Sequence, residues 1–291
     1  YGNALVSQES VKILERNLSN VKSNLEEINK IYNSGFTELE NVEQLKITYG
    51  SVKNSLDYSI KLNKTSLNLL KLIMGYDIEK EIVLSNSLQD LTLKNILEKQ
   101  SIEDFEIEKN IDYQMALNNT KSQQTLLTLE KSKALPTLRA FIKGGYEGNN
   151  NSFKFFKPDQ KWYGYSIAGV SMSIPVFSSL RKSAKTQQAK IEFEKSKIDL
   201  SESKNKIIIQ LDNANSEYEY AVNSYNNAVE NVKLAEKIER KNQIKFLEGL
   251  ISGLDLRQAQ IQLYSIQNQL LQSMLEVINK KTNLDIILTQ N

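Results

Sequence analysis

The feature that most constrains the fold of this chain is a heptad spacing of apolar residues that recurs in four long stretches. Within each stretch the apolar positions alternate steps of three and four residues, which places them along one narrow side of an under-wound α-helix. The third stretch starts at Ile207 and ends at Ala235, and alanine recurs in it every seven residues from Ala214 onward. Small residues at these positions allow two helices to pack closely. The spacing predicts helices over residues 4–33, 40–74, 99–134, 181–247 and 254–288.

The longest of these predicted helices is too long for an ordinary domain. At 1.5 Å per residue, a helix over residues 181–247 would extend for about 100 Å. Glycine and proline are sparse, with 11 and 3 residues in the whole chain, which also indicates long elements with few turns. A plain coiled coil would explain the periodicity equally well.

The first and last predicted helical pairs are two copies of one pattern. A shift of 214 residues places Gly35 on Gly249, and the same shift places Tyr32 on Phe246. The heptad register continues on both sides of these turns, although few residues are identical. A solenoid would show shorter and more numerous repeats. The pattern therefore indicates one helical hairpin that has been duplicated.

Between the two copies the sequence alternates with a period of two, from 136 to 146 and again from 162 to 176. Apolar side chains fill one face of both segments, small or polar ones fill the other, and the polar run 148–151 separates the segments. This is the pattern of a transmembrane β-hairpin with a lipid-facing side and an aromatic girdle. The alternative is a soluble amphipathic hairpin that covers a helix. The predicted lipid-facing residues are Leu138, Ala140, Ile142, Ala168, Val170, Met172 and Ile174, and the predicted girdle residues are Tyr146, Trp162, Tyr163 and Tyr165.

Composition excludes several classes of function. The chain has no cysteine and no histidine, so thiolate or imidazole metal sites and Cys or His catalysis are absent. The formal net charge of +2 and the scattered basic residues give no nucleic-acid patch. No phosphate-binding loop or dinucleotide motif is present. No apolar run approaches the ~18 residues of a spanning helix. We therefore expect neither an enzyme nor a cofactor.

Four short stretches, taken in their order along the chain, carry a family resemblance. They lie before the first strand, after the second strand and at the two helical turns. Together with the duplication and the intervening hairpin, they resemble the TolC-like outer-membrane efflux proteins, the outer membrane factors of tripartite efflux and type I secretion systems. The resemblance covers nearly the whole chain. The four stretches are residues 134–138 (ALPTL), 173–181 (SIPVFSSLR), 246–258 (FLEGLISGLDLRQ) and 32–44 (YNSGFTELENVEQ).

The resemblance implies a mainly α fold with a β-hairpin. Long antiparallel helical hairpins of a homotrimer would form an α-barrel in the periplasm, and the strands would contribute to a transmembrane β-barrel in the outer membrane. The hairpin tips would dock a periplasmic adaptor (membrane fusion) protein that links the duct to an inner-membrane pump. The implied divisions are a first-repeat hairpin at 1–74, an equatorial connection at 75–98, a second-repeat helix at 99–135, a transmembrane hairpin at 136–176 and a second-repeat long hairpin at 177–291.

The resemblance also implies a pore aperture at the periplasmic end. Asp255 matches the first of two aspartates that narrow the aperture in the family, whereas Gln258 replaces the second. Three Asp255 side chains around the trimer axis would attract cations and raise their own pKa by mutual repulsion. Alternatively, Asp255 caps a helix start, and the two roles are compatible.

The predicted tips combine turn glycines with apolar neighbours. Glycine allows the backbone to reverse between two helices. An exposed apolar tip suggests a binding partner, here the adaptor. The residues concerned are Gly35, Phe36, Leu39, Gly249, Leu250, Ile251 and Leu254.

Two functions without a channel remain as alternatives. One is a periplasmic structural or adaptor coiled-coil protein, and the other is a soluble spectrin-like spacer. Adaptors carry a single helical hairpin flanked by compact β domains, whereas here two helical hairpins flank one β-hairpin. A spacer would not need the strands. The order of elements therefore favours the duct, which would pass solutes or polypeptides to the cell exterior.

The duplication predicts further sequence before Tyr1. The family has four strands per protomer and this chain has two, and the shift places Tyr1 opposite Asn215. A trimer with two strands per protomer would have only six, fewer than the usual eight or more. We expect roughly 100–130 upstream residues with a helix, a second β-hairpin and the start of a long helix. Reading the upstream coding sequence tests this, and a start codon and signal peptide directly before Tyr1 would contradict it.

Overall fold

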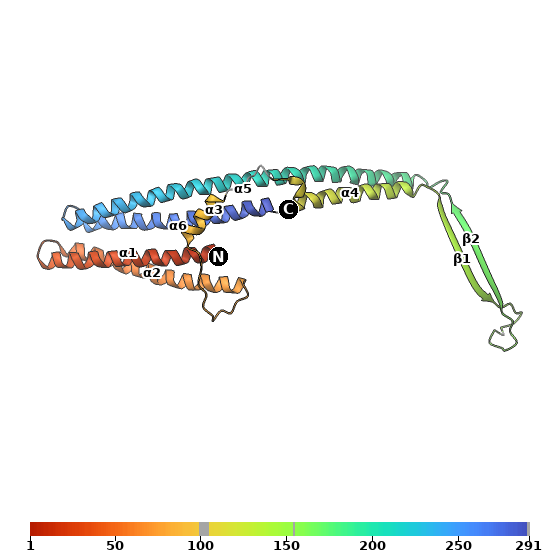
Figure 1. Ribbon diagram of the computed structural model, residues 1–291, viewed down its shortest axis with the longest axis horizontal. Coiled ribbons are helices and arrows are strands. Elements are labelled where there is room, and N and C mark those ends of the chain that lie inside the picture. Colours follow the sequence, from red (N-terminus) through yellow and green to blue (C-terminus); the bar gives the residue numbers. More distant parts are fainter. Residues whose placement is uncertain (99–104, 154, 290–291) are drawn as a thin grey trace. The chain divides into compact units, whose positions relative to one another are not determined.

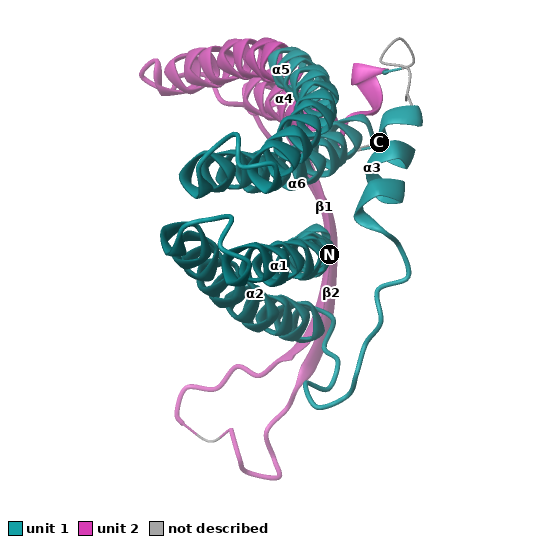
Figure 2. Ribbon diagram, turned by 90° about the vertical axis from the view of Figure 1, so that its left-hand side faces the viewer, with its two compact units in different colours: residues 1–105, 208–291 teal, residues 106–207 magenta. Residues whose placement is uncertain are grey.

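The computed structural model describes residues 1–98, 105–153 and 155–289 (Figure 1). It divides into two compact units, which are coloured separately in Figure 2. The first unit contains residues 1–105 and 208–291, and the second contains residues 106–207. None of the described helices is long and apolar enough to cross a membrane.

The first unit consists of two helical hairpins and a short helix. Helices α1 (Gly2–Asn33) and α2 (Leu39–Ile73) form one hairpin. The part of α5 (Arg181–Leu247) after residue 207 and α6 (Gly253–Thr289) form the other. Helix α3 (Leu88–Leu97) packs on α6 and α1. Both α1 and α2 also contact α6, so the two hairpins lie side by side in this unit (Figure 2).

The heptad positions of α5 form the main core of this unit. Leu211, Ala214, Tyr218, Ala221 and Tyr225 are buried and cluster with buried residues of α6. The small alanines alternate with tyrosines, and the hydroxyl of Tyr218 donates to the carbonyl oxygen of Asn95 in α3 at 2.9 Å. The predicted seam is therefore confirmed along α5. The α6 residues of the cluster are Leu271, Met274, Val277, Ile278 and Leu284.

The contact between the two hairpins contains buried amides that the heptad analysis missed. Asn17 of α1 is 5% exposed and donates to Gln267 of α6 at 3.0 Å. About two helical turns further along α1, Asn24 is 1% exposed and accepts a hydrogen bond from Gln243 of α5 at 2.6 Å. Hydrogen-bonded amides thus contribute to the contact between the two hairpins.

The second unit carries the strands. Helix α4 (Ile111–Ser132) is followed by β1 (Thr137–Glu147) and β2 (Tyr163–Ser173), which pair antiparallel, and by the first part of α5. The hydroxyl of Thr120 in α4 donates to the backbone carbonyl of Ser196 in α5 at 3.0 Å, and this hydrogen bond joins the two helices. Near the strands, the Lys182 ammonium donates to the Lys133 carbonyl at 2.6 Å and so satisfies a carbonyl at the end of α4.

The junction between β2 and α5 bends sharply. Ser179 and Leu180, directly before α5, both have positive φ, at 47° and 61°. Residues other than glycine rarely adopt this conformation, and two in succession reverse the chain locally. The bend lies between the end of β2 at Ser173 and the start of α5 at Arg181.

The mainly helical fold with one antiparallel pair of strands is confirmed, with two corrections to the predicted helices. Helix α4 begins at Ile111 rather than at 99, because Asn110 caps it by accepting from the backbone N–H groups of Asp112 and Tyr113. The 99–104 part of the predicted helix lies outside the described residues. The segment 75–98, expected as a connection, contains α3. Its start has a sequence signal, because Ser87 and Asp90 form a capping box at α3.

Candidate functional site

The register of the β-hairpin places its uncharged and charged residues on opposite faces. Leu138 pairs with Met172, Ala140 with Val170, and Ile142 with Ala168, which brings these six predicted lipid-facing residues onto one face. Ile174 lies just beyond the end of β2. The large side chains of this face are exposed, with Ile142 at 83% and Val170 at 69%. The face therefore has no cover within the described chain.

The opposite face holds every charged residue of the two strands. Arg139 pairs with Ser171, Lys143 with Ile167, and Glu147 with Tyr163. Aromatic rings fill the space above the glycines of this face. A Cβ atom on Gly169 would come within 2.7 Å of the Phe141 ring, and one on Gly145 within 3.1 Å of the Tyr165 hydroxyl. Gly169 therefore has a packing reason to be glycine, because Phe141 lies across it.

The four aromatic residues predicted as a girdle gather near the loop end but do not share a face. Tyr146 pairs with Gly164 on the uncharged face. Tyr163 and Tyr165 pair with Glu147 and Gly145 on the charged face, and Trp162 precedes β2. The clustering of these aromatic residues in the sequence does not reveal this division. The alternation of side chains between the two faces of a strand does predict it.

The two hairpin tips have the same backbone geometry. Gly35 and Gly249 adopt left-handed φ values of 79° and 74°. In both turns the glycine N–H donates to the carbonyl three residues earlier, and the next N–H donates to the carbonyl five residues earlier. These are the hydrogen bonds of a Schellman-type helix end, which favours glycine. The shift of 214 residues thus relates the turn hydrogen bonds as well as the sequence.

The predicted docking residues at the tips are mostly exposed. Phe36 is 85% exposed, Leu250 is 68% exposed, and Leu254 and Leu39 are 59% and 47% exposed. Ile251 differs, because it packs on the buried cluster that joins the two tips. That cluster draws on both hairpins and consists of Ile28, Val42, Leu45, Phe246 and Leu256.

Asp255, the predicted aperture residue, is exposed and belongs to a capping box at the start of α6. Its carboxylate accepts from the Ser252 backbone N–H at 3.0 Å and from the Ser252 hydroxyl at 2.7 Å. Ser252 in turn accepts from the Asp255 N–H at 3.2 Å. Ser252 is therefore the N-cap, and Asp255 is the third helical residue rather than the cap itself. Gln258, one turn later, is also exposed.

A neighbouring contact fixes this helix start against the first tip. The amide oxygen of Asn41 accepts from the backbone N–H of Gly253 at 2.9 Å. A Cβ atom on Gly253 would lie 3.1 Å from that oxygen, so glycine allows the approach. Asn41 is the repeat counterpart of Asp255. The two equivalent positions thus have different roles. Asp255 bonds to Ser252 at the start of its own helix, whereas Asn41 joins the first tip to the second.

Two hydrogen bonds from Ser252 lower the pKa of Asp255 in the single chain. The bond from the Ser252 hydroxyl has the larger effect, and the bond from the Ser252 backbone N–H has the smaller one.

We predict that Asp255→Ala raises single-channel conductance and weakens block by multivalent cations, because a ring of three carboxylates at the aperture would be removed. Planar-bilayer recording of the full-length protein measures both. Ser252→Ala is the control, because it removes the capping hydroxyl but keeps the carboxylate. Unchanged conductance and unchanged block in Asp255→Ala would show that Asp255 has no role at the aperture and serves only the helix start.

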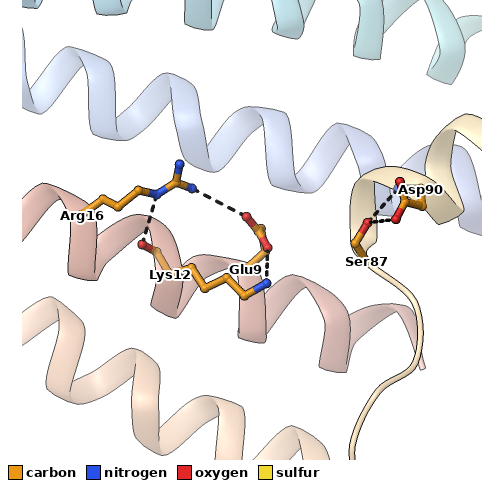
Figure 3. A network of polar contacts seen from close by, with 5 residues as sticks. All are labelled: Glu9, Lys12, Arg16, Ser87 and Asp90. Carbon is orange, nitrogen blue, oxygen red and sulfur yellow. Dashed lines mark hydrogen bonds and ion pairs between the residues drawn. The ribbon is translucent and has the colours of Figure 1, made fainter.

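A charged groove on the first unit was not predicted from the sequence. Its walls come from α1, α5, α6 and the start of α3. On α1, Glu9 pairs with Lys12 at 3.1 Å and with Arg16 at 3.7 Å, beside the capping box of Ser87 and Asp90 (Figure 3). These pairs are exposed and contribute little stability.

Glu239 lies along the same groove as a half-buried carboxylate. Burial raises its pKa, an effect partly offset by a hydrogen bond from the Gln260 side-chain amide at 3.4 Å. Gln260 is 1% exposed, and its amide oxygen has no partner within the described residues. Burial and the nearby Glu239 carboxylate also raise the pKa of Tyr264.

The raised pKa of Glu239 predicts a pH-dependent stability. The folded state holds the proton more tightly than the unfolded state, so this contribution is present below the unfolded pKa and is lost as pH rises through the folded pKa. We expect Glu239→Gln to flatten the fall in stability with rising pH and to be more stable than the native protein at neutral pH. Urea unfolding at acidic and neutral pH measures this. Glu236→Gln, an exposed neighbour on α5, is the control, and equal pH profiles for all three proteins would contradict the prediction.

Comparison with known proteins identifies the class. Residues 106–289 match the family model described as outer membrane efflux protein. This match covers more than half of the chain, and the chain therefore belongs to the outer membrane efflux protein family. The family consists of channels rather than enzymes. No curated protein sequence matches the chain.

Solved structures share the fold at low sequence identity. CusC, solved in a study of folding and transmembrane channel formation, has 13% identity and a TM-score of 0.75, over 99% of this chain and 66% of CusC. The outer membrane protein VceC from Vibrio cholerae has 15% identity and a TM-score of 0.72, over 99% and 67%. The open MtrE outer membrane channel of Neisseria gonorrhoeae has 16% identity and a TM-score of 0.71, over 99% and 64%. This chain thus spans about two thirds of the length of these channels.

Proposed function

We propose that this chain is the greater part of one protomer of a trimeric outer-membrane duct for efflux or secretion. The single observation that carries the proposal is the segregation of charge on the β-hairpin. All three charged residues of the strands lie on one face, and the other face holds only uncharged residues, with large exposed side chains at Leu138, Ile142 and Val170. A charged residue on the lipid face of a strand costs about 2–4 kcal/mol at the bilayer midplane, so this division suits a wall between lipid and water.

The strand length agrees with this placement. Each strand has 11 residues, and a tilted membrane-crossing strand needs about 9–11. An isolated pair of strands would leave backbone groups unpaired at both edges, which lipid does not tolerate. In the proposed trimer, strands of three protomers close one β-barrel in the outer membrane and remove these edges. The helical hairpins form the periplasmic α-barrel.

The tips are proposed as the docking site for a periplasmic adaptor that links the duct to an inner-membrane pump. Phe36 and Leu250 occupy equivalent positions directly after the turn glycines, and both are exposed. Exposed apolar residues at two equivalent turns suit a repeated contact with a partner. Asp255 is proposed to line the aperture beside these tips. The exported solute or polypeptide passes from this end to the cell exterior.

Planar-bilayer recording of the purified full-length protein tests the proposal. We expect stepwise conductance increases of uniform size, because each inserted trimer opens one duct. A protein that inserts into no bilayer and conducts no ions would contradict the duct. That result would favour the alternative of a periplasmic structural or adaptor coiled coil.

A further inference from the structure

The strands and their flanking helix ends form the most basic segment of the chain. Between residues 131 and 190 there are eleven Lys or Arg residues against two Asp or Glu residues, whereas the whole chain has a net charge of only +2. The remainder of the chain is therefore acidic in balance. The basic residues are Lys131, Lys133, Arg139, Lys143, Lys154, Lys157, Lys161, Arg181, Lys182, Lys185 and Lys190.

Two of these charges lie within the strands and on the same face. Arg139 and Lys143 are four residues apart on β1, an even spacing that puts both on the face opposite the predicted lipid-facing residues, together with Phe141 and Ile167. Glu147, the single acidic residue of the strands, is at the loop end of β1. Neither Arg139 nor Lys143 forms an ion pair within the part of the chain that the structure describes. Their positive charge is therefore not neutralised within the hairpin.

The immediate surroundings of Lys143 are aromatic and uncharged. Its ammonium group lies 5.7 Å from the centre of the Phe141 ring, and its cross-strand partner is Ile167. Phe141 is in turn held against Gly169. Lys143 thus has aromatic and uncharged neighbours, and no acidic side chain of the described residues forms an ion pair with it.

We infer that the charged face of the β-hairpin makes the membrane section of the duct selective for anions. The inference rests on the proposed function, since it requires this face to line a water-filled lumen. Threefold symmetry would then place three Lys143 and three Arg139 side chains around one passage. Rings of Arg or Lys side chains attract anions and repel cations, especially where a low-dielectric wall focuses the field. The membrane section therefore favours anionic solutes, such as carboxylates or phosphates, whereas the proposed Asp255 ring at the aperture attracts cations.

The test uses reversal potentials of the full-length protein in planar bilayers under a potassium chloride gradient. All recordings are made in the Asp255→Ala background, which lacks the proposed acidic aperture, and for the protein with native strands we expect the sign that denotes chloride over potassium. Lys143→Glu and Arg139→Glu should each shift the potential toward potassium, and the double variant should reverse its sign. Lys143→Gln should give an intermediate shift. Lys61→Glu, an equal charge change on an exposed position of α2 in the other unit, is the control.

The outcomes separate this inference from the proposed function. Absence of conductance in the native protein would overturn the duct and the inference together. Conductance with potassium preferred in the protein with native strands and Asp255→Ala, or with a reversal potential that does not move in Lys143→Glu and Arg139→Glu, would overturn the inference and leave the duct intact. Heat-resistant trimers on denaturing gels show that each variant has assembled before it is recorded.

Discussion

Replacing Ile142 or Val170 with arginine should sharply reduce the amount of assembled protein in the outer membrane. Both residues lie on the uncharged face of the hairpin, near the middle of their strands, and both are exposed in the single chain. If that face contacts lipid, each substitution costs about 2–4 kcal/mol near the midplane. The measurement is the yield of trimer in purified outer membranes, compared with the native protein at equal expression.

Ile167→Arg is a matched control for Ile142→Arg. Ile167 pairs with Lys143, the residue next to Ile142, so the same substitution is made at nearly the same depth on the opposite face. It brings two positive charges together, which is destabilising, but cross-strand pairs change stability by only about 0.2–1 kcal/mol. We therefore expect Ile167→Arg to assemble nearly normally. Normal trimer yields for both Ile142→Arg and Val170→Arg would show that the lipid-facing assignment is wrong.

Leu256→Ala should destabilise the helical part by about 2–5 kcal/mol, the usual range for a buried leucine. Leu256 is fully buried in the cluster that joins the two tips, where it packs with Val42, Leu45 and Phe246. The substitution leaves a cavity between two hairpins that the surrounding helices cannot easily close. The midpoint of urea unfolding, followed by circular dichroism, measures the loss.

Leu254→Ala, two residues earlier, separates folding from docking. Leu254 is 59% exposed, so its substitution should change stability by no more than about 0.5 kcal/mol. If the tip binds an adaptor, Leu254→Ala should weaken that binding while the unfolding midpoint is retained. Equal stability losses in the two variants would contradict the assignment of Leu256 to the core and Leu254 to the surface.

The long helices were predictable because one physical rule governs them along their length. From Leu211 to Tyr225, the buried residues of α5 cluster mainly with residues of α6, so the heptad positions in the sequence are the buried positions in the structure. The rule was less complete for α1, which faces a second hairpin as well. There Asn17 and Asn24 are buried because amides of the other hairpin bond to them, and a search for apolar residues passes over them.

For the β-hairpin and the tips, the sequence predicted some features and did not reveal others. Alternation was sufficient to place Ile142 and Val170 on one face, but clustering of aromatic residues did not separate Tyr146 from Tyr163. At the second tip, α6 begins two residues before Asp255, because the pattern Ser-x-x-Asp starting at Ser252 forms the capping box. The contact between Asn41 and Gly253 joins positions 212 residues apart, and only the packed pair of hairpins reveals it.

The central claim, that three copies of this protein form one duct, is tested most directly by the mass of the full-length protein in detergent. Light scattering with correction for bound detergent gives the number of protomers without reference to any substrate or partner. A mass of three subunits is the predicted result, because the proposed β-barrel is closed by strands from three protomers. A protein that is monomeric or dimeric at all concentrations in mild detergent would contradict the claim.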